Sequence, residues 1–125
     1  MITKQIALAI HEEQIRGYQG MPGVRDEGLL ESALNRAYPT WGDQDLRPDP
    51  LEKAAALLEG IVGNHPFFDG NKRTGYAIAR IQLLRQGLTI EASREERYQL
   101  VIAVATKQLA FEGIVEWLRA HTAPV

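Results

Sequence analysis

The strongest constraint on the fold of this chain is the segment 74–86, which is apolar on nearly every side of a helix. With 3.6 residues per turn, its apolar side chains spread around the whole circumference and do not form a single stripe. These side chains are Ala77, Ile78, Ala79, Ile81, Leu83 and Leu84. A helix with this pattern has to be covered by other helices on most sides. The segment therefore predicts the central helix of a bundle, and Gly87 marks its end.

The other apolar residues predict about five further helices around this centre. They recur at helical spacing in residues 3–17, 26–37, 49–64, 93–107 and 111–121. Residues 88–90 form at most a short extended connector between two of these helices. We therefore expect an all-α fold, a compact bundle of about six helices without a convincing sheet, in one domain that spans residues 1–125.

Polar residues at the expected helix starts support these boundaries. The side chains of Asp26 and Asp49 are suited to accept hydrogen bonds from the free backbone N–H groups in the first turn of a helix. Pro50 follows Asp49 at the first helical position. Glu52 is placed to close a capping box with Asp49. Ser93 is followed by Glu96, which predicts a second capping box at the start of the fifth helix.

The composition excludes several classes of protein. The chain has 125 residues, 45% hydrophobic content, no cysteine and a net charge of −2 with both signs interspersed. These values fit one globular core, exclude disulfides and thiolate metal sites, and give no basis for general nucleic-acid binding. No apolar run is long enough to span a membrane, and the first residues do not resemble a secretory signal. We therefore expect a soluble, cytoplasmic domain.

Residues 38–49 differ from the rest of the chain. They are polar, rich in helix-breaking residues, and contain an isolated tryptophan, Trp41. Such a stretch predicts a long surface loop, and long loops in compact domains are often functional. Trp41 is equally consistent with a contact to a partner protein and with an anchor for the loop.

A dense group of polar residues lies directly before the central helix, in the run His65-Pro66-Phe67-Phe68-Asp69-Gly70-Asn71-Lys72-Arg73-Thr74-Gly75. The first backbone N–H groups of a helix have no partners within the helix, so those of residues 71–73 are suited to bind phosphate. Gly70 leaves room for a phosphate near the backbone. Lys72 and Arg73 add positive charge, and Arg73 can bind two phosphate oxygens at once.

Two further side chains of this run have a chemical role that suits phosphate transfer. Asp69 would repel phosphates unless a Mg²⁺ ion lies between them, and Mg²⁺ is usually held by one or two carboxylates together with phosphate oxygens. His65 is the group whose pKa suits a general base near neutral pH. Pro66 stiffens the turn and Phe67 anchors it in the core. The run predicts transfer from a nucleoside triphosphate, such as ATP, to a hydroxyl group.

Two simpler enzymatic interpretations fail on the residues present. A zinc hydrolase needs more protein ligands than one histidine, His65, and one carboxylate, Asp69. Lys72 does not lie in a glycine-rich Walker loop, which argues against a P-loop nucleotide site. Taken singly, the residues of the run also have ordinary structural explanations, but their order along one loop favours a site.

The run HPFFDGNKRTG resembles the signature of the Fic family, in which His, Pro, Phe, an acidic residue, Gly, Asn and Arg follow one another at this spacing. The segment Tyr18-x-Gly20-x-Pro22-Gly23 and the Asn-Lys-Arg-Thr form of the motif resemble the Doc (death-on-curing) branch. The resemblance covers roughly residues 5–120. It implies a Fic fold with the motif loop between two core helices, and a toxin of a type II toxin–antitoxin pair. It further implies a kinase-like activity that moves the γ-phosphate of ATP to a threonine of elongation factor Tu and stops translation.

The resemblance also implies roles for individual residues. His65 would be the catalytic base or a transient phosphate acceptor, and Asp69 would contact Mg²⁺. Asn71, Lys72 and Arg73 would hold phosphates. The loop around Trp41 would correspond to the flap that docks the target segment in Fic proteins. A short, partly disordered, Phd-like antitoxin would fold onto a groove near the site.

Two residues depart from the pattern of the Fic enzymes that transfer AMP. Lys72 stands where those enzymes have a second glycine, and Tyr76 stands where they have a second arginine. Both changes favour a different placement of the nucleotide, and hence transfer of phosphate. AMP transfer and a catalytically idle binding domain remain the alternatives.

Other polar residues support weaker expectations. We expect His11 to be a hydrogen-bonded core residue and His121 to be solvated. Arg80 lies two helical turns after Arg73 and either extends the cationic site or pairs with a carboxylate. The run of charged residues at 94–97 is expected to be a solvated helix face.

Overall fold

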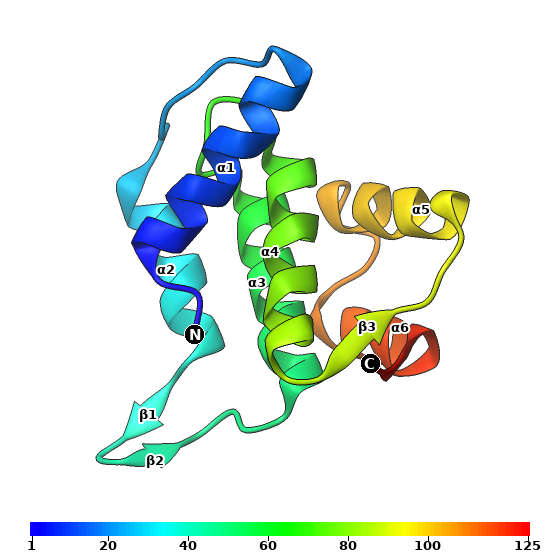
Figure 1. The fold of residues 1–125 in the computed structure, drawn as a ribbon. Coiled ribbons are helices and arrows are strands. Elements are labelled where there is room, and N and C mark those ends of the chain that lie inside the picture. Colours follow the sequence, from blue (N-terminus) through cyan, green and yellow to red (C-terminus); the bar gives the residue numbers. More distant parts are fainter.

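The computed structural model describes residues 1–125 and contains six helices (Figure 1). They are α1 (Lys4–Tyr18), α2 (Glu27–Ala37), α3 (Pro50–Asn64), α4 (Asn71–Arg85), α5 (Arg94–Ala105) and α6 (Phe111–His121). The all-α class is confirmed. The central helix α4 begins at Asn71, so its first turn is formed by the polar residues of the motif. None of the helices combines the length and the apolar character needed to cross a lipid bilayer.

Helices α3 and α4 lie side by side at the centre of the molecule (Figure 1). Helices α1 and α2 cover one side of this pair, and α5 and α6 cover the other. Helix α4 contributes buried residues to both halves of the core, Ile78 to the α1/α2 half and Leu83 to the α5/α6 half. This two-sided burial is the reason why its sequence is apolar on nearly every face.

Two glycines allow the central helices to approach closely. A Cβ atom added at Gly75 of α4 would lie 2.5 Å from Cγ2 of Val62 in α3. One added at Gly60 of α3 would lie 2.6 Å from Cβ of Ala33 in α2. Both distances are shorter than van der Waals contact, so the packing of α2, α3 and α4 requires the absence of a side chain at these positions.

The helix caps form as expected, with one exception. The carboxylate of Asp26 accepts from the backbone N–H of Leu29 at 3.0 Å, and Ser93 and Glu96 form the reciprocal capping box. The carboxylate of Asp49 accepts from the backbone N–H of Leu51 at 2.8 Å. Glu52 does not close a box with Asp49; its Oε1 lies 3.6 Å from a guanidinium nitrogen of Arg47.

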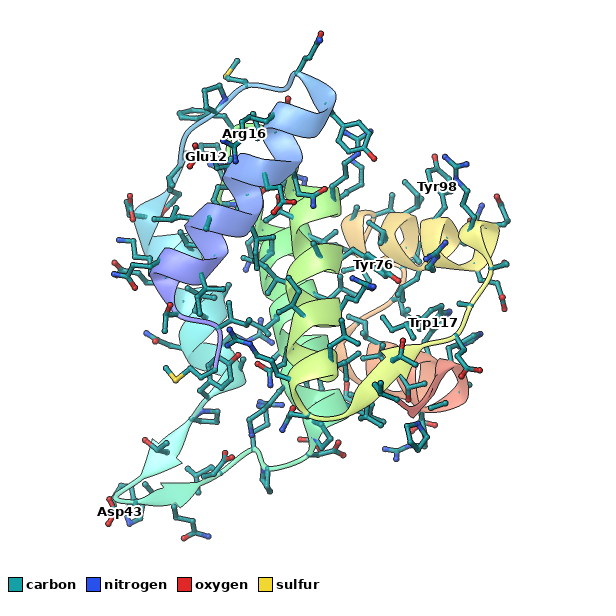
Figure 2. The ribbon with its side chains drawn as sticks, viewed as in Figure 1. Glu12, Arg16, Asp43, Tyr76, Tyr98 and Trp117 are labelled. Carbon is teal, nitrogen blue, oxygen red and sulfur yellow. The ribbon has the colours of Figure 1, made fainter.

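Residues 38–49 contain a short hairpin of two strands, β1 (Thr40–Trp41) and β2 (Gln44–Asp45). The hairpin projects from the molecule at the N-terminal end of α3, with Asp43 at its tip (Figures 1 and 2). The buried Lys53 of α3 donates to the carboxylate of Asp45 at 2.7 Å and to the carbonyl of Arg47. This contact fixes the base of the hairpin, whereas the Trp41 side chain is 78% exposed. The loop is therefore not anchored by Trp41.

A second pair of short strands involves the connector expected at residues 88–90. Strand β3 (Leu88–Ile90) pairs in antiparallel register with β4 (Thr122–Pro124), so that Thr89 lies opposite Ala123. The connector after α4 thus becomes a strand because the end of the chain returns beside it. Residues this far apart in sequence leave no local periodic signal of their pairing.

Candidate active site

The motif forms a tight loop of residues 65–70 between the end of α3 and the start of α4. His65 adopts a left-handed conformation with φ 55°, and its backbone N–H still donates to the carbonyl of Ile61 at 3.3 Å. Gly70 has φ 76°, a conformation that glycine adopts without strain. Since Gly70 has no side chain to cap α4, the first N–H groups of α4 are left for an external acceptor.

A second segment, residues 20–26, runs along this loop and holds it. The backbone N–H groups of Arg25 and Asp26 both donate to the carbonyl of Pro66, at 2.8 and 3.0 Å. The side chain of Arg25 donates to the carbonyls of His65 at 2.7 Å and Asn64 at 3.0 Å. Gly23 of the Tyr18-x-Gly20-x-Pro22-Gly23 pattern also contacts the loop, because its carbonyl accepts from the backbone N–H of Phe68 at 3.3 Å.

Asn71 and Phe67 fix the inside of the loop. The side-chain oxygen of Asn71 accepts from the backbone N–H of Phe67, and its amide nitrogen donates to the carbonyl of the same residue, both at 3.0 Å. The Phe67 ring is 1% exposed, which confirms that it anchors the loop. Because the Asn71 side chain points back to the loop, its expected phosphate contact would come from its backbone N–H.

Asp69 is held as an ionised carboxylate at the start of α4. Its Oδ2 accepts from the backbone N–H of Met21 at 3.0 Å and its Oδ1 from that of Gly70 at 2.8 Å. These two hydrogen bonds lower the pKa of Asp69, and the nearby positive charge of Arg73 lowers it further. A Cβ at Gly20 would lie 2.7 Å from Oδ2, so the bend at Gly20 makes room for this carboxylate.

The donor set around Asp69 fits a Mg²⁺ ion shared with phosphates. The chain contains no group of three or more His, Cys, Asp or Glu side chains that could hold a metal ion by themselves. Each carboxylate oxygen of Asp69 uses one of its two lone pairs in the bonds to the backbone, so acceptor capacity remains on both. A single carboxylate of this kind is a usual Mg²⁺ ligand when phosphate oxygens supply others.

His65 lies at the opposite end of the loop from Gly70 and is exposed. Desolvation of the imidazole by the neighbouring groups lowers the pKa of His65, and the positive charges of Arg25, Lys72 and Lys107 lower it further. The neutral ring, which can accept a proton, is therefore favoured at neutral pH. His65 has the accessibility and the protonation state that a general base requires.

A groove of about 480 Å³ opens at the first turn of α4 and continues along α5. Residues 69–73 all line it, together with Tyr76, so the structure brings together every candidate site residue except His65. The guanidinium carbon of Arg73 lies 3.4 Å above the ring centroid of Tyr18. This cation–π contact holds the Arg73 side chain against Tyr18 at the C-terminal end of α1.

The far side of the groove contains cations that the sequence did not identify as functional. Arg94 and Arg97 of α5 line it, along with Tyr98, Val101 and Ile102. Arg94 is exposed and Arg97 is half-buried, so the two arginines lie on the expected solvated face and also line the groove. Their helical spacing with Tyr98 and Val101 places them on one face of α5, and this spacing is the signal that could have found them.

Three other expectations about single residues have different outcomes. His11 is 4% exposed, which confirms it as a core residue. His121 is only half-exposed and is not a free surface side chain, because its ring stacks on Trp117 at 4.0 Å and its Nε2 lies 3.2 Å from Glu96. Arg80 is exposed, neither lines the groove nor makes an ion pair, and so does not extend the cationic site.

The position of the hairpin corrects the expected flap. The β1–β2 hairpin with Trp41 lies at the N-terminal end of α3, whereas the motif loop lies at its C-terminal end (Figure 1). A helix of this length separates its two ends by about 22 Å. The segment that accompanies the motif loop is residues 20–26 and not the hairpin. Trp41 remains a candidate contact for a partner at a distance from the site.

Comparison with known proteins identifies the family of the chain. Residues 1–83 match the model of the Fic/DOC family. The chain is 36% identical over 102 residues to the protein named toxin Doc from Mycolicibacterium smegmatis. This alignment covers 80% of this chain and 78% of that protein. The chain is also 29% identical over 118 residues to the protein named protein kinase doc from Escherichia phage P1. This second alignment covers 94% of this chain and 92% of that protein. The chain is therefore a member of the Fic/DOC family, in the branch of the Doc toxins.

Proposed function

We propose that this protein is a Doc-like toxin that transfers the γ-phosphate of ATP to a hydroxyl group of a protein. The observation that carries the proposal is the groove at the open N-terminus of α4, which Lys72 and Arg73 line beside the ionised Asp69. A triphosphate fits this combination because helix N–H groups and fixed cations bind its oxygens. The name of the phage P1 relative, protein kinase doc, supports the same activity.

The residues of the loop would divide the reaction among them. The neutral imidazole of His65 takes the proton of the acceptor hydroxyl as its oxygen attacks the γ-phosphorus. The bond between the γ-phosphorus and the bridging oxygen breaks, and ADP leaves. Lys72, Arg73 and the free N–H groups of α4 stabilise the negative charge of the phosphates. Asp69 would hold Mg²⁺, which would supply positive charge against the phosphates when it is bound.

Two positions favour phosphate transfer over the alternative of AMP transfer. The side chain of Lys72 occupies the groove where a glycine would allow the nucleotide to approach the backbone more closely. Tyr76 lines the same groove and packs against the α5/α6 half of the core, so no second arginine binds a phosphate there. The placement of the nucleotide therefore differs from that in enzymes that transfer AMP.

The biological setting follows from the Doc resemblance. The proposed acceptor is a threonine of elongation factor Tu, whose modification would stop translation in the cytoplasm. The name toxin Doc of the M. smegmatis relative supports a cognate antitoxin, which we propose to be short, partly disordered and Phd-like. The antitoxin would bind near the site and neutralise the toxin.

The proposal is tested by incubating the protein with γ-labelled ATP, Mg²⁺ and elongation factor Tu, and by expressing the same variants in cells. We expect label on a threonine and growth arrest, and both should be lost in His65→Ala, because removal of a general base costs about 10²–10⁴ in rate. Arg73→Gln should reduce transfer, whereas its matched control Arg80→Gln should not. Growth arrest by His65→Ala would instead indicate a catalytically idle binding domain.

A further inference from the structure

The backbone of His65 has a conformation that its own helix does not stabilise. Its φ of 55° and ψ of 58° lie in the left-handed region, which is unfavourable for a residue with a Cβ atom. The last carbonyl groups of a helix have no partners within the helix, and the last turn of α3 contains no basic side chain that could bind them. Groups outside α3 therefore have to hold the end of this helix and, with it, the backbone of His65.

The donors to the end of α3 come from two distant parts of the chain. In the segment 20–26, which runs beside the motif loop (Figure 1), Arg25 donates from Nε to the carbonyl of His65 at 2.7 Å and from Nη2 to that of Asn64 at 3.0 Å. Lys107, which follows α5, donates from Nζ to the carbonyl of Gly63 at 3.1 Å. Neither cation makes an ion pair, so the bonds of both side chains within the protein go to the end of α3.

The two bonds of the Arg25 side chain act on both backbone dihedral angles of His65. The carbonyl of Asn64 belongs to the peptide plane before the Cα atom of His65, and the carbonyl of His65 belongs to the plane after it. Because a guanidinium group is planar and rigid, two of its N–H groups that bind these carbonyls fix the two planes relative to each other. The Arg25 guanidinium thus sets the direction in which the His65 imidazole leaves the backbone.

Arg25 also acts on the imidazole through its charge. Desolvation lowers the pKa of His65, and three cations lower it further: Arg25 from the segment 20–26, Lys72 from α4 and Lys107 after α5. A lowered pKa favours the neutral ring, which can accept a proton. Of the three cations, Arg25 is the one that also binds the carbonyl of His65 itself.

We propose that Arg25 is the positioning residue of the general base, and that its two hydrogen bonds hold His65 in the orientation that accepts the proton of the acceptor hydroxyl. This proposal rests on the proposed function. Arg25 acts through His65 and does not line the groove of the α4 first turn. It is exposed, so its replacement removes no part of the core.

The first test separates the hydrogen bonds of Arg25 from its charge by kinetics at about pH 8, where an ordinary histidine is neutral. Arg25→Gln should lower kcat for transfer to elongation factor Tu by about 10–10²-fold and leave both KM values unchanged, because a small misplacement of a reacting group has this cost. Arg25→Lys should lose less, since an ammonium group binds as a point charge and not as a planar fork. The matched control Arg119→Gln, on the exposed face of α6, should change neither constant.

The second test follows His65 by NMR in the absence of substrates. The pKa of His65 should rise in Arg25→Gln, stay low in Arg25→Lys and rise in Lys107→Met, which removes a charge but no bond to His65. Exchange of the His65 backbone N–H should be faster in Arg25→Gln than in the wild type and in Arg119→Gln, because the last turn of α3 loosens. Lys107→Met should not reproduce the loss of kcat.

Two kinetic results would overturn the positioning role. The first is a wild-type kcat in Arg25→Gln, or in Arg25→Lys if thermal unfolding shows that Arg25→Gln does not fold. The second is a loss that appears only in KM for elongation factor Tu, which would show that Arg25 binds the acceptor protein.

The NMR measurements distinguish this proposal from the proposed function, because they need no substrate. If the pKa and the exchange respond in Arg25→Gln but the wild type transfers no phosphate, the proposed function fails and the hold of Arg25 on the His65 backbone stands. If the wild type transfers phosphate and Arg25→Gln changes neither kcat nor the exchange, the role of Arg25 fails and the proposed function stands.

Discussion

The Nε2 atom of His11 lies 2.9 Å from the backbone carbonyl oxygen of Asp69. Because a carbonyl can only accept, Nε2 carries the proton and donates it. The His11 ring also stacks on Phe67, with centroids 3.8 Å apart and an angle of 6° between the planes. A buried residue of α1 therefore fixes the backbone of the residue proposed to hold the metal ion.

This contact predicts a role of His11 in positioning and stability. His11→Phe retains an aromatic ring for stacking but loses the hydrogen bond, and should lower the free energy of unfolding by about 1 kcal/mol. His11→Ala should cost more, because it also leaves a cavity against Phe67. Urea denaturation measures both values. Equal stability of the wild type and His11→Phe would contradict the role of the hydrogen bond.

The close approach of α3 and α4 predicts that Gly75 does not tolerate a side chain. Gly75→Ala should lower stability by about 1–3 kcal/mol, because the new Cβ would overlap with Val62. The second substitution Val62→Ala should cost less in the Gly75→Ala background than in the wild type, since it removes the overlapping methyl group.

The matched control is Gly17→Ala in α1. A Cβ at Gly17 has no atom within 4 Å, so alanine should stabilise the protein by up to about 1 kcal/mol through helix propensity. Thermal unfolding of the variants measures these effects. A neutral Gly75→Ala variant would contradict the packing described between the two central helices.

The lowered pKa of His65 predicts the pH dependence of transfer. A general base acts in its neutral form, so the acidic limb of kcat/KM should lie below the pKa of an ordinary histidine, about 6.5. Lys107→Met removes one of the positive charges and should shift this limb to higher pH, whereas Arg119→Met on the exposed face of α6 should not. A limb at or above pH 6.5 that does not respond to Lys107→Met would argue against His65 as the base.

Lys72 predicts which part of the nucleotide is transferred. Lys72→Gly removes the side chain that crowds the backbone and should lower γ-phosphate transfer while it raises the share of AMP transferred. Lys72→Ala tests the loss of the charge without the added backbone freedom of glycine. Transfer assays with α-labelled and γ-labelled ATP measure the two products. If Lys72→Gly still transfers only the γ-phosphate, and at the wild-type rate, then Lys72 does not decide between phosphate transfer and AMP transfer.

The sequence predicts the helices of this fold well because their signals are local. Asp26, Asp49 and Ser93 occupy the N-caps that their types favour, and Gly87, with φ 80°, follows the end of α4. The composition of α4 also predicts its central place, because a helix needs apolar residues all round only when it is covered on both sides. The motif loop is predictable for the same reason, since its residues are contiguous.

The features that the sequence does not predict depend on residues that are distant along the chain. Strand β3 pairs with β4 only because the chain end returns to it. Arg94 and Arg97 cannot be told from a solvated face until α5 is seen to lie across the first turn of α4. The contact of His121 with Glu96 joins two helices and leaves no signal in the local sequence. The stacking of His121 on Trp117 differs, because the two residues are four positions apart on one helix and the sequence shows this spacing.

The central claim is that the loop at the start of α4 transfers the γ-phosphate of ATP to a protein hydroxyl. Its most direct test is the intact mass of elongation factor Tu after incubation with the protein, ATP and Mg²⁺, together with identification of the small-molecule product. We predict the added mass of one phosphoryl group and the release of one ADP for each group added. An added AMP with release of pyrophosphate would contradict the claim.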